Sequence, residues 1–188
     1  MFFYVLIYKW VKNMKKCKHT KVNINNHKMI PFEDNIFLND IFSYFLYKAP
    51  SISSSFSKEI DFNDDQLFKE FININRFKNI VFYRKRSDKL YIDNNLYGDY
   101  VCMKCLKIIN SRVIDSYDNE LESYLECVLR HIRNSIAHGS VYYLFENKRH
   151  YIMFEDFNYR NVITSRIVMT RQTLLNLKSK LIRYQRNK

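Results

Sequence analysis

Three polar residues near the end of a predicted helix have types and a spacing that suit acid–base chemistry on a phosphate. Arg133, Asn134 and His138 lie in the run Arg-Asn-Ser-Ile-Ala-His-Gly, which ends at Gly139. On a helix, Asn134 and His138 are four residues apart, so the amide of Asn134 can reach and orient the imidazole. Histidine is the side chain most often used as a general acid or base, and an arginine beside it can stabilise charge on phosphorus.

The helix that must position these residues is predicted to run from Asp118, as its N-cap, to His138. At about 100° per residue, its apolar residues fall within a stripe roughly 100° wide, which predicts the buried face. They are Leu121, Leu125, Val128, Leu129, Ile132 and Ile136. Asn134 and His138 lie on one side of this stripe and Arg133 lies on the other. Gly139 is typical of the residue that ends a helix.

The run from Arg133 to Gly139 resembles the Arg-x-x-x-x-His signature of HEPN domains, including the polar residue that follows the arginine. It is similar to a subgroup in which the helix ends at Ala-His-Gly and a β-hairpin with Phe-x-Asp follows. Here that sequence is Phe154–Glu155–Asp156. The resemblance covers residues 99–188 and only loosely the first half of the chain.

The resemblance implies a metal-independent endoribonuclease that works as a homodimer, with two such motifs facing each other. His138 would move the proton while the 2′-hydroxyl of RNA attacks its own phosphate, Arg133 would hold the phosphate, and Asn134 would orient the histidine. DNA lacks the 2′-hydroxyl, so this mechanism selects RNA. The resemblance also implies bacterial defence or a toxin–antitoxin pair, with an antitoxin or defence-system partner, and it implies no cofactor and no metal.

Two alternatives stay open at this point. A HEPN domain can bind nucleotide, RNA or a protein partner without cutting, and a basic nucleic-acid-binding protein of unrelated fold can carry the motif by chance. Because Arg133, Asn134 and His138 are all present, the sequence favours cleavage over the first alternative. The two HEPN interpretations expect a dimer in which two such motifs face each other, whereas the unrelated nucleic-acid-binding protein does not, so a structure of the dimer would distinguish them.

The cysteines offer a weaker candidate for a metal site. Cys102-x-x-Cys105 has the spacing of half a zinc site, and Cys17-x-His19 could supply the other half. Two small apolar residues on one face of a predicted helix explain Cys102 and Cys105 better than zinc does.

His131, His150 and Asp156 are further polar residues that could belong to a site. Cys127 and His131 are four residues apart beside the face of the candidate site, but two ligands do not make a metal site. His150 falls in the predicted hairpin and has no evident partner. Asp156 is expected to order Arg133 or a backbone group, and a catalytic role for it is less favoured.

The net charge of +12 is concentrated at the two ends of the chain. Residues 1–30 carry seven Lys, residues 159–188 carry eight Lys and Arg, and neither segment has an acid, which leaves −3 for residues 31–158. Basic ends on a nearly neutral middle suit a polyanion, so the charge favours RNA as a partner. Solubility of a Lys-rich chain is the alternative explanation.

Composition predicts one domain that spans residues 1–188, with a basic N-terminal segment at 1–30. A chain of 188 residues that is 47% hydrophobic can bury enough apolar surface to offset the entropy of ordering, which excludes intrinsic disorder. The apolar start Met1–Val11 is interrupted by Lys9, and a membrane span needs about 20 apolar residues, so no membrane partner is expected. Four irregularly spaced cysteines favour a reducing cytoplasm over a disulfide framework.

Periodicity predicts five helices and three strands. The helices are expected at Ile36–Tyr47, Asp61–Arg84, Tyr100–Ile114, Asp118–His138 and Arg171–Tyr184. The strands are expected at Val141–Phe145, Tyr151–Phe157 and Asn161–Met169. The predicted fold class is therefore mainly α, a HEPN-like helical bundle with a small β-hairpin or meander inserted before the C-terminal helix.

Overall fold

A mixed β-sheet lies against a layer of helices in the computed structural model, which describes residues 21–24, 28–29, 36–48, 65–83, 100–110, 113–115, 120–146 and 148–186. The helices are α2 (Ile36–Lys48), α3 (Asp65–Asn75), α5 (Tyr124–Ala137) and α6 (Arg171–Arg186). The strands are β1 (Lys21–Asn23), β2 (Lys28–Met29), β3 (Asn79–Tyr83), β4 (Tyr100–Cys102), β5 (Cys105–Ile109), β6 (Val113–Asp115), β7 (Glu120–Leu121), β8 (Val141–Glu146), β9 (Arg149–Phe157) and β10 (Ile163–Met169).

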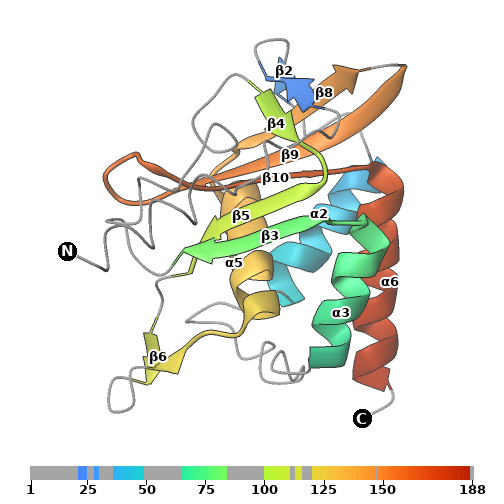
Figure 1. The fold of residues 1–188 in the computed structure, drawn as a ribbon. Coiled ribbons are helices and arrows are strands. Elements are labelled where there is room, and N and C mark those ends of the chain that lie inside the picture. The colour runs from blue at the N-terminus through green and yellow to red at the C-terminus, as the bar shows by residue number, and fades with distance from the viewer. Residues whose placement is uncertain are drawn as a thin grey trace, which may run out of the picture.

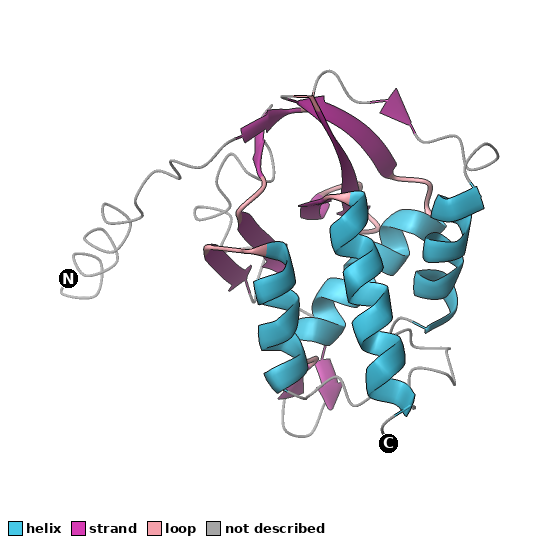
Figure 2. Ribbon diagram, turned by 90° about the vertical axis from the view of Figure 1, so that its right-hand side faces the viewer, coloured by secondary structure: helices cyan, strands magenta, loops and turns pink. Residues whose placement is uncertain are grey.

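The main sheet has six strands in the order β2-β8-β9-β10-β5-β3 (Figure 1). All neighbours pair antiparallel except β3 and β5, which are parallel. Figure 2 shows the helices gathered on one side of these strands. The short pairs β1–β4 and β6–β7 form two further small sheets.

Each face of the main sheet buries its own apolar cluster, because successive side chains of a strand point to opposite faces. Toward the helices, Ile152 and Phe154 of β9 join the buried residues of all four helices in the larger cluster. On the other face, Tyr151 and Met153 of the same strand pack with Val101 of β4. The second cluster shows that both faces of the sheet are covered.

The prediction of a mainly α bundle is wrong, because the described part of the chain builds a mixed sheet with helices on one side. The predicted helix Tyr100–Ile114 is replaced by β4, a turn and β5. All five residues of β5 are buried. The short segment Cys-Leu-Lys-Ile-Ile fits a buried helix and a buried strand equally well by periodicity, and the β-branched pair Ile108–Ile109 favours the strand.

The helix predicted from Asp61 to Arg84 is also too long. α3 ends at Asn75, and Arg76 takes a left-handed conformation with φ of 55°, which breaks the helix. The β-branched and aromatic residues that follow form β3. α2, α6 and the three predicted strands β8, β9 and β10 are confirmed to within two residues at each end.

The helix that carries the candidate residues starts later than predicted. Its N-cap is Ser123, whose hydroxyl accepts a hydrogen bond from the backbone N–H of Glu126 at 3.2 Å. Ser123-x-x-Glu126 is a capping box sequence, so the N-cap predicted at Asp118 is wrong and the local signal for the true start lies five residues later. Asp118 itself lies outside the described residues, between the paired strands β6 and β7.

Several sequence-based predictions fall on residues that are not described. These include the apolar start Met1–Val11, most of the basic segment 1–30, and the half-site Cys17-x-His19. No helix in the described ranges combines the length and the apolar character that crossing a bilayer requires.

Candidate functional site

α5 ends in a hydrogen-bonded turn that exposes His138. Gly139 has φ of 67°, its N–H donates to the carbonyl of Ile136 at 3.1 Å, and Ser140 N–H donates to the carbonyl of Ser135 at 2.8 Å. These two bonds are the Schellman pattern, so the prediction that Gly139 ends the helix is confirmed. His138 is the C-cap residue, and its side chain is exposed.

This turn requires a left-handed backbone conformation at residue 139, which can be tested by substitution. A Cβ added to Gly139 would meet no atom within 4 Å, so Gly139→Ala should act only through backbone strain. We expect a loss of about 1 kcal/mol of unfolding free energy and a melting temperature lower by about 2–4 °C. Gly139→Asn should cost less, because Asn tolerates the left-handed region. Thermal denaturation of both variants checks this, and equal losses for Ala and Asn would contradict it.

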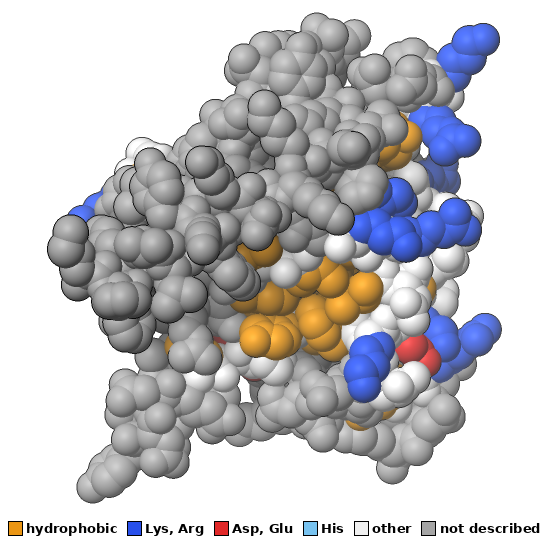
Figure 3. Space-filling model, viewed as in Figure 1, with side chains coloured by type: hydrophobic (Ala, Val, Ile, Leu, Met, Phe, Trp, Pro, Cys, Tyr) orange, Lys and Arg blue, Asp and Glu red, His pale blue; other side chains and the backbone are white. Residues whose placement is uncertain are grey.

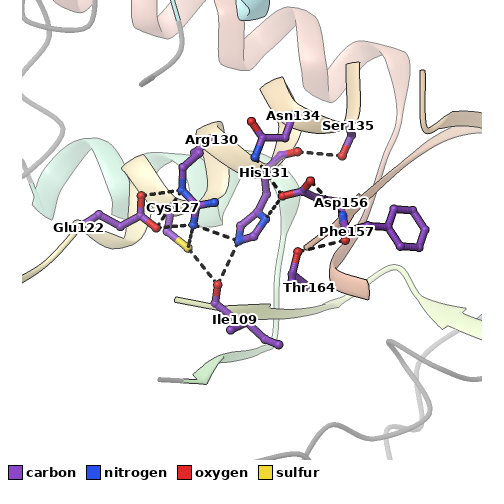
Figure 4. Close-up of polar contacts among 10 residues, drawn as sticks. All are labelled: Ile109, Glu122, Cys127, Arg130, His131, Asn134, Ser135, Asp156, Phe157 and Thr164. Carbon is purple, nitrogen blue, oxygen red and sulfur yellow. Dashed lines mark hydrogen bonds and ion pairs between the residues drawn. The ribbon is translucent and has the colours of Figure 1, made fainter. Parts of the chain in front are cut away.

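Asn134, the residue expected to orient His138, is bonded elsewhere. Its amide nitrogen donates to Oδ2 of Asp156 on β9 at 3.2 Å (Figure 4). The only hydrogen bond that links Asn134 and His138 in this described region is the helical one, from His138 N–H to the Asn134 carbonyl at 2.9 Å. Asn134 therefore holds the last turn of α5 against the sheet.

Asp156 is the acceptor at the centre of this contact. His131 Nδ1 lies 2.6 Å from its Oδ2, which also accepts from Asn134, and the backbone N–H of Phe157 donates to its Oδ1 at 3.0 Å. Asp156 and Phe154 lie two residues apart on β9, so both side chains point toward the helices. The expectation that Asp156 would hold a backbone group is met, whereas Arg133 contacts another part of the chain.

His131 and Asp156 form a buried pair that resembles the arrangement in catalytic triads, but its burial argues for a structural role. Their exposed fractions are 2% and 3%. The second ring nitrogen of His131, Nε2, lies 3.0 Å from the carbonyl oxygen of Ile109 on β5 and 3.3 Å from Nη2 of Arg130. Both nitrogens are thus engaged inside the protein, which leaves neither for a substrate.

The same network continues along α5 toward its N-terminal end (Figure 4). Arg130 donates from Nε to both carboxylate oxygens of Glu122, at 3.1 and 2.8 Å, and from Nη2 to Oε1. Burial alone would lower the pKa of the Arg130 guanidinium, but Glu122 more than offsets this and raises it. Glu122 is itself 2% exposed, so this is a buried ion pair whose charges satisfy each other.

Cys127 completes the network and is not suited to nucleophilic chemistry. Its thiol lies 3.9 Å from the Ile109 carbonyl oxygen, as a weak donor. Burial, together with the nearby carboxylate of Glu122, raises the pKa of the thiol well above its usual value. A thiol that stays protonated and buried is a poor nucleophile.

Arg133 reaches the end of a different helix. Its Nε donates to the carbonyl of Leu46, in the last turn of α2, at 3.2 Å. A cation at this position satisfies an open carbonyl and complements the negative end of the helix dipole. The Nη atoms of this half-buried side chain have no hydrogen-bond partner among the described residues. Arg133 and His138 are separated by about 140° around α5, so the helix does not bring them together.

Those of the remaining predicted candidates that the structure describes do not assemble into a metal site. Cys102 and Cys105 are buried on either side of the β4–β5 turn, where Lys104 N–H donates to Cys102 Sγ at 3.4 Å. In the described part of the chain, no cluster of three or more His, Cys, Asp or Glu could hold a metal ion. His150 is exposed near the far end of β9, and its ring meets Tyr143 edge to face.

Sequence reasoning missed Glu122 and Arg130 and underestimated His131. A buried acid is rare unless paired, but burial is not visible in a sequence. One signal was present: Arg130 and His131 extend the row of polar residues that Asn134 and His138 continue on α5, since positions three, four and seven apart share a face. On an amphipathic helix a polar row usually faces solvent, so this signal marks the row but does not show that Arg130 and His131 are drawn into a network inside the protein.

Comparisons with protein-family models, with curated protein sequences and with solved structures give no match to this chain. The fold and the site define its class on their own. It is an α-plus-β protein in which a buried His–Asp network anchors a central helix whose C-terminal end presents an exposed histidine.

Proposed function

We propose that this chain is a metal-independent endoribonuclease whose acid–base residue is His138. The observation that carries the proposal is the end of α5, where a single exposed histidine stands on a helix fixed by buried hydrogen bonds. A general acid or base must reach solvent and substrate, and it must be held in place. His138 meets the first requirement because its side chain is exposed. Asn134 and His131, on the preceding turns of α5, bond to Asp156 of β9 and so hold the helix end in place.

The proposed phosphate-binding residue is Arg133. Its anchored Nε leaves a planar guanidinium that can donate two hydrogen bonds to a phosphate. Since Arg133 and His138 face different directions on one helix, we propose that a site combines His138 of one protomer with Arg133 of its partner in a two-fold dimer. The predicted helical bundle gives the proposal no support, because the described residues form a mixed sheet, so it rests on the Arg133–Gly139 motif and on the geometry at the end of α5.

Positive charge supports RNA as the substrate. The support is weaker than the number of Lys and Arg residues indicates, because some of these side chains are paired with acids. Lys178 and Lys180 of α6 are paired with Asp40 and Glu70, at 2.5 and 3.1 Å. Figure 3 shows Lys and Arg side chains along the right-hand side of the molecule, from the level of the β8–β9 hairpin at the top down to that of α3 and α6. Unpaired cations there would contact phosphates, so affinity for RNA should fall as salt rises.

A second candidate function is binding of RNA, nucleotide or a protein partner without cleavage. It is favoured by the structural bonds of two motif residues, since Arg133 caps α2 and Asn134 holds Asp156. In this case the motif would stabilise the end of α5, and His138 would be an ordinary surface residue.

Cleavage products separate the two candidates. We expect the purified chain to cut single-stranded RNA in excess EDTA and to leave 2′,3′-cyclic phosphate and 5′-hydroxyl ends, because the 2′-hydroxyl is the nucleophile. The all-DNA strand of the same sequence is the matched control and should stay intact. End-group analysis by mass spectrometry provides the measurement. Cutting that requires added divalent metal and leaves 5′-phosphates would reject the mechanism, and RNA that is bound but never cut would favour the second candidate.

The cellular setting belongs to the proposal as well. A role in bacterial defence or a toxin–antitoxin pair follows from the motif resemblance alone, as does an antitoxin or defence partner. A reducing cytoplasm is supported by three free thiols in the described residues, at Cys102, Cys105 and Cys127.

A further inference from the structure

The turn between β9 and β10 presents an aromatic ring and a guanidinium to solvent. Tyr159 is 86% exposed, which makes it the most exposed large hydrophobic residue in the described part of the chain. The guanidinium of Arg160 lies over its ring, 5.0 Å from the centroid. Phe157, two residues before Tyr159, is 39% exposed. Figure 1 shows this turn projecting at the left of the molecule.

Hydrogen bonds within the turn fix its conformation. The side-chain oxygen of Asn158 accepts from the backbone N–H groups of Arg160 and Val162, at 2.9 and 3.1 Å. Backbone bonds from Asn158 to Val162 and from Asn161 to Asn158, both 2.9 Å, close it, and Asn161 takes a left-handed φ of 54°. Tyr159 is therefore held out from a closed, hydrogen-bonded tip, so less conformational entropy is lost when a ligand binds to it.

The tip is tied to the candidate site through β9. Asp156, three residues before Tyr159, is bonded to Asn134 of α5, and Thr164 Oγ1 of β10 donates to the Asp156 carbonyl at 3.0 Å. On the other side, Ser140, two residues after His138, accepts a bond from Glu155 N–H at 3.0 Å. Tyr159 is four residues after Glu155, which is at most about 14 Å of chain. A short strand of RNA can therefore span His138 and the tip.

We propose that Tyr159 and Arg160 form a stacking platform for a base of single-stranded RNA, within a short strand's reach of the scissile phosphate at His138. This inference rests on the proposed function, since it assigns the tip to the same substrate. Arg160 covers one face of the ring, and the high exposure leaves the other face to a base. Aromatic faces stack on any base, whereas a neighbouring guanidinium is suited to the adjoining phosphate. Paired bases are already stacked, so the platform should select single strands.

Binding to an uncleavable oligonucleotide tests this inference. The probe is a fluorescein-labelled single strand with 2′-O-methyl riboses, read by fluorescence anisotropy, and the same strand annealed to its complement is the duplex probe. We expect Tyr159→Ala and Tyr159→Leu to weaken single-strand binding by about 5- to 100-fold. Tyr159→Phe should stay within about twofold, because it keeps the ring. The duplex probe should respond to none of the three variants.

A second exposed tyrosine provides the matched control. Tyr124 is 52% exposed and begins α5, so it lies about 20 Å from His138 along the helix. Tyr124→Leu should leave single-strand binding unchanged. The inference is overturned if Tyr159→Leu binds the single strand as well as the wild type does, or if single-strand and duplex affinities fall together. Because the probe cannot be cut, its binding is measured independently of ribonuclease activity. If the chain cuts RNA but its binding does not depend on Tyr159, only the stacking platform is rejected. If binding depends on Tyr159 but the chain does not cut RNA, only the ribonuclease proposal is rejected.

Discussion

His138→Ala should abolish RNA cleavage while leaving the fold intact. Loss of a general acid or base typically costs 10²–10⁴-fold in rate. The side chain is exposed at the end of α5, so its removal should change the unfolding free energy by less than about 0.5 kcal/mol. Single-turnover cleavage and thermal denaturation measure the two effects. His150→Ala is the matched control, because His150 is also exposed but lies toward the far end of β9, and it should cut RNA at the wild-type rate. Full activity in His138→Ala would reject the proposed site.

Arg133→Ala should be nearly as severe if the arginine holds the phosphate. Removing one preorganised donor to a developing oxyanion costs about 10²–10³-fold in rate. The variant also loses the bond to the Leu46 carbonyl, so its stability must be measured beside its activity. Arg133→Lys keeps the charge but loses the planar fork, and it should recover only part of the rate.

Mixing the two inactive variants tests the dimer. If each site joins His138 of one protomer to Arg133 of its partner, a mixed dimer of His138→Ala and Arg133→Ala has one intact site and one doubly damaged site. With random exchange, half of the dimers are mixed, so about a quarter of the wild-type activity should return. No recovery after subunit exchange would place Arg133 and His138 in separate roles or in one protomer.

The elements that could be predicted from sequence are those whose patterns are long or bounded. α6 is amphipathic over four turns, and β8–β10 are rich in β-branched and aromatic residues bounded by polar segments, so the sequence predicts all four elements. β5 could not be identified, because five consecutive buried residues carry no period and its neighbours in the sheet are distant in sequence. The mixed sheet that results depends on long-range pairing of β3 with β5 and of β5 with β10, which local patterns do not encode.

The site could be predicted only at its exposed end. Gly139 and the helix end follow from local rules of capping, and the structure confirms them. The partners of Asn134 and Arg133 lie 22 and 87 residues away in sequence, on β9 and α2. Spacing on one helix therefore gave the wrong partner for Asn134, because a tertiary acceptor replaced the neighbour four residues away. A charged acceptor in a buried setting is the stronger bond.

Asp156→Ala should be among the most destabilising single substitutions in the described part of the protein, whether or not the chain cuts RNA. The substitution leaves a buried donor on His131 and part-buried donors on Asn134 and Phe157 without their acceptor. Leaving a buried polar group without its hydrogen-bond partner costs about 1–3 kcal/mol, so losing the shared acceptor should cost about 3–5 kcal/mol in all, which for a chain of this size lowers the melting temperature by on the order of 10 °C. Thermal and urea denaturation measure it.

Asp40→Ala is the matched control for this substitution. The Asp40 carboxylate also accepts a side-chain hydrogen bond, from Lys178 at 2.5 Å, but the Asp40 side chain is 68% exposed. A surface pair of this kind is worth less than about 1 kcal/mol. In a double-mutant cycle, Asp156→Ala should cost less when His131 is already Ala, with a coupling of about 0.5–3 kcal/mol between them. The network would lose its assigned role if Asp156→Ala were no more destabilising than Asp40→Ala. If the coupling is found, the end of α5 is held from inside the protein, and His138 keeps its position because Asp156 fixes the turn before it.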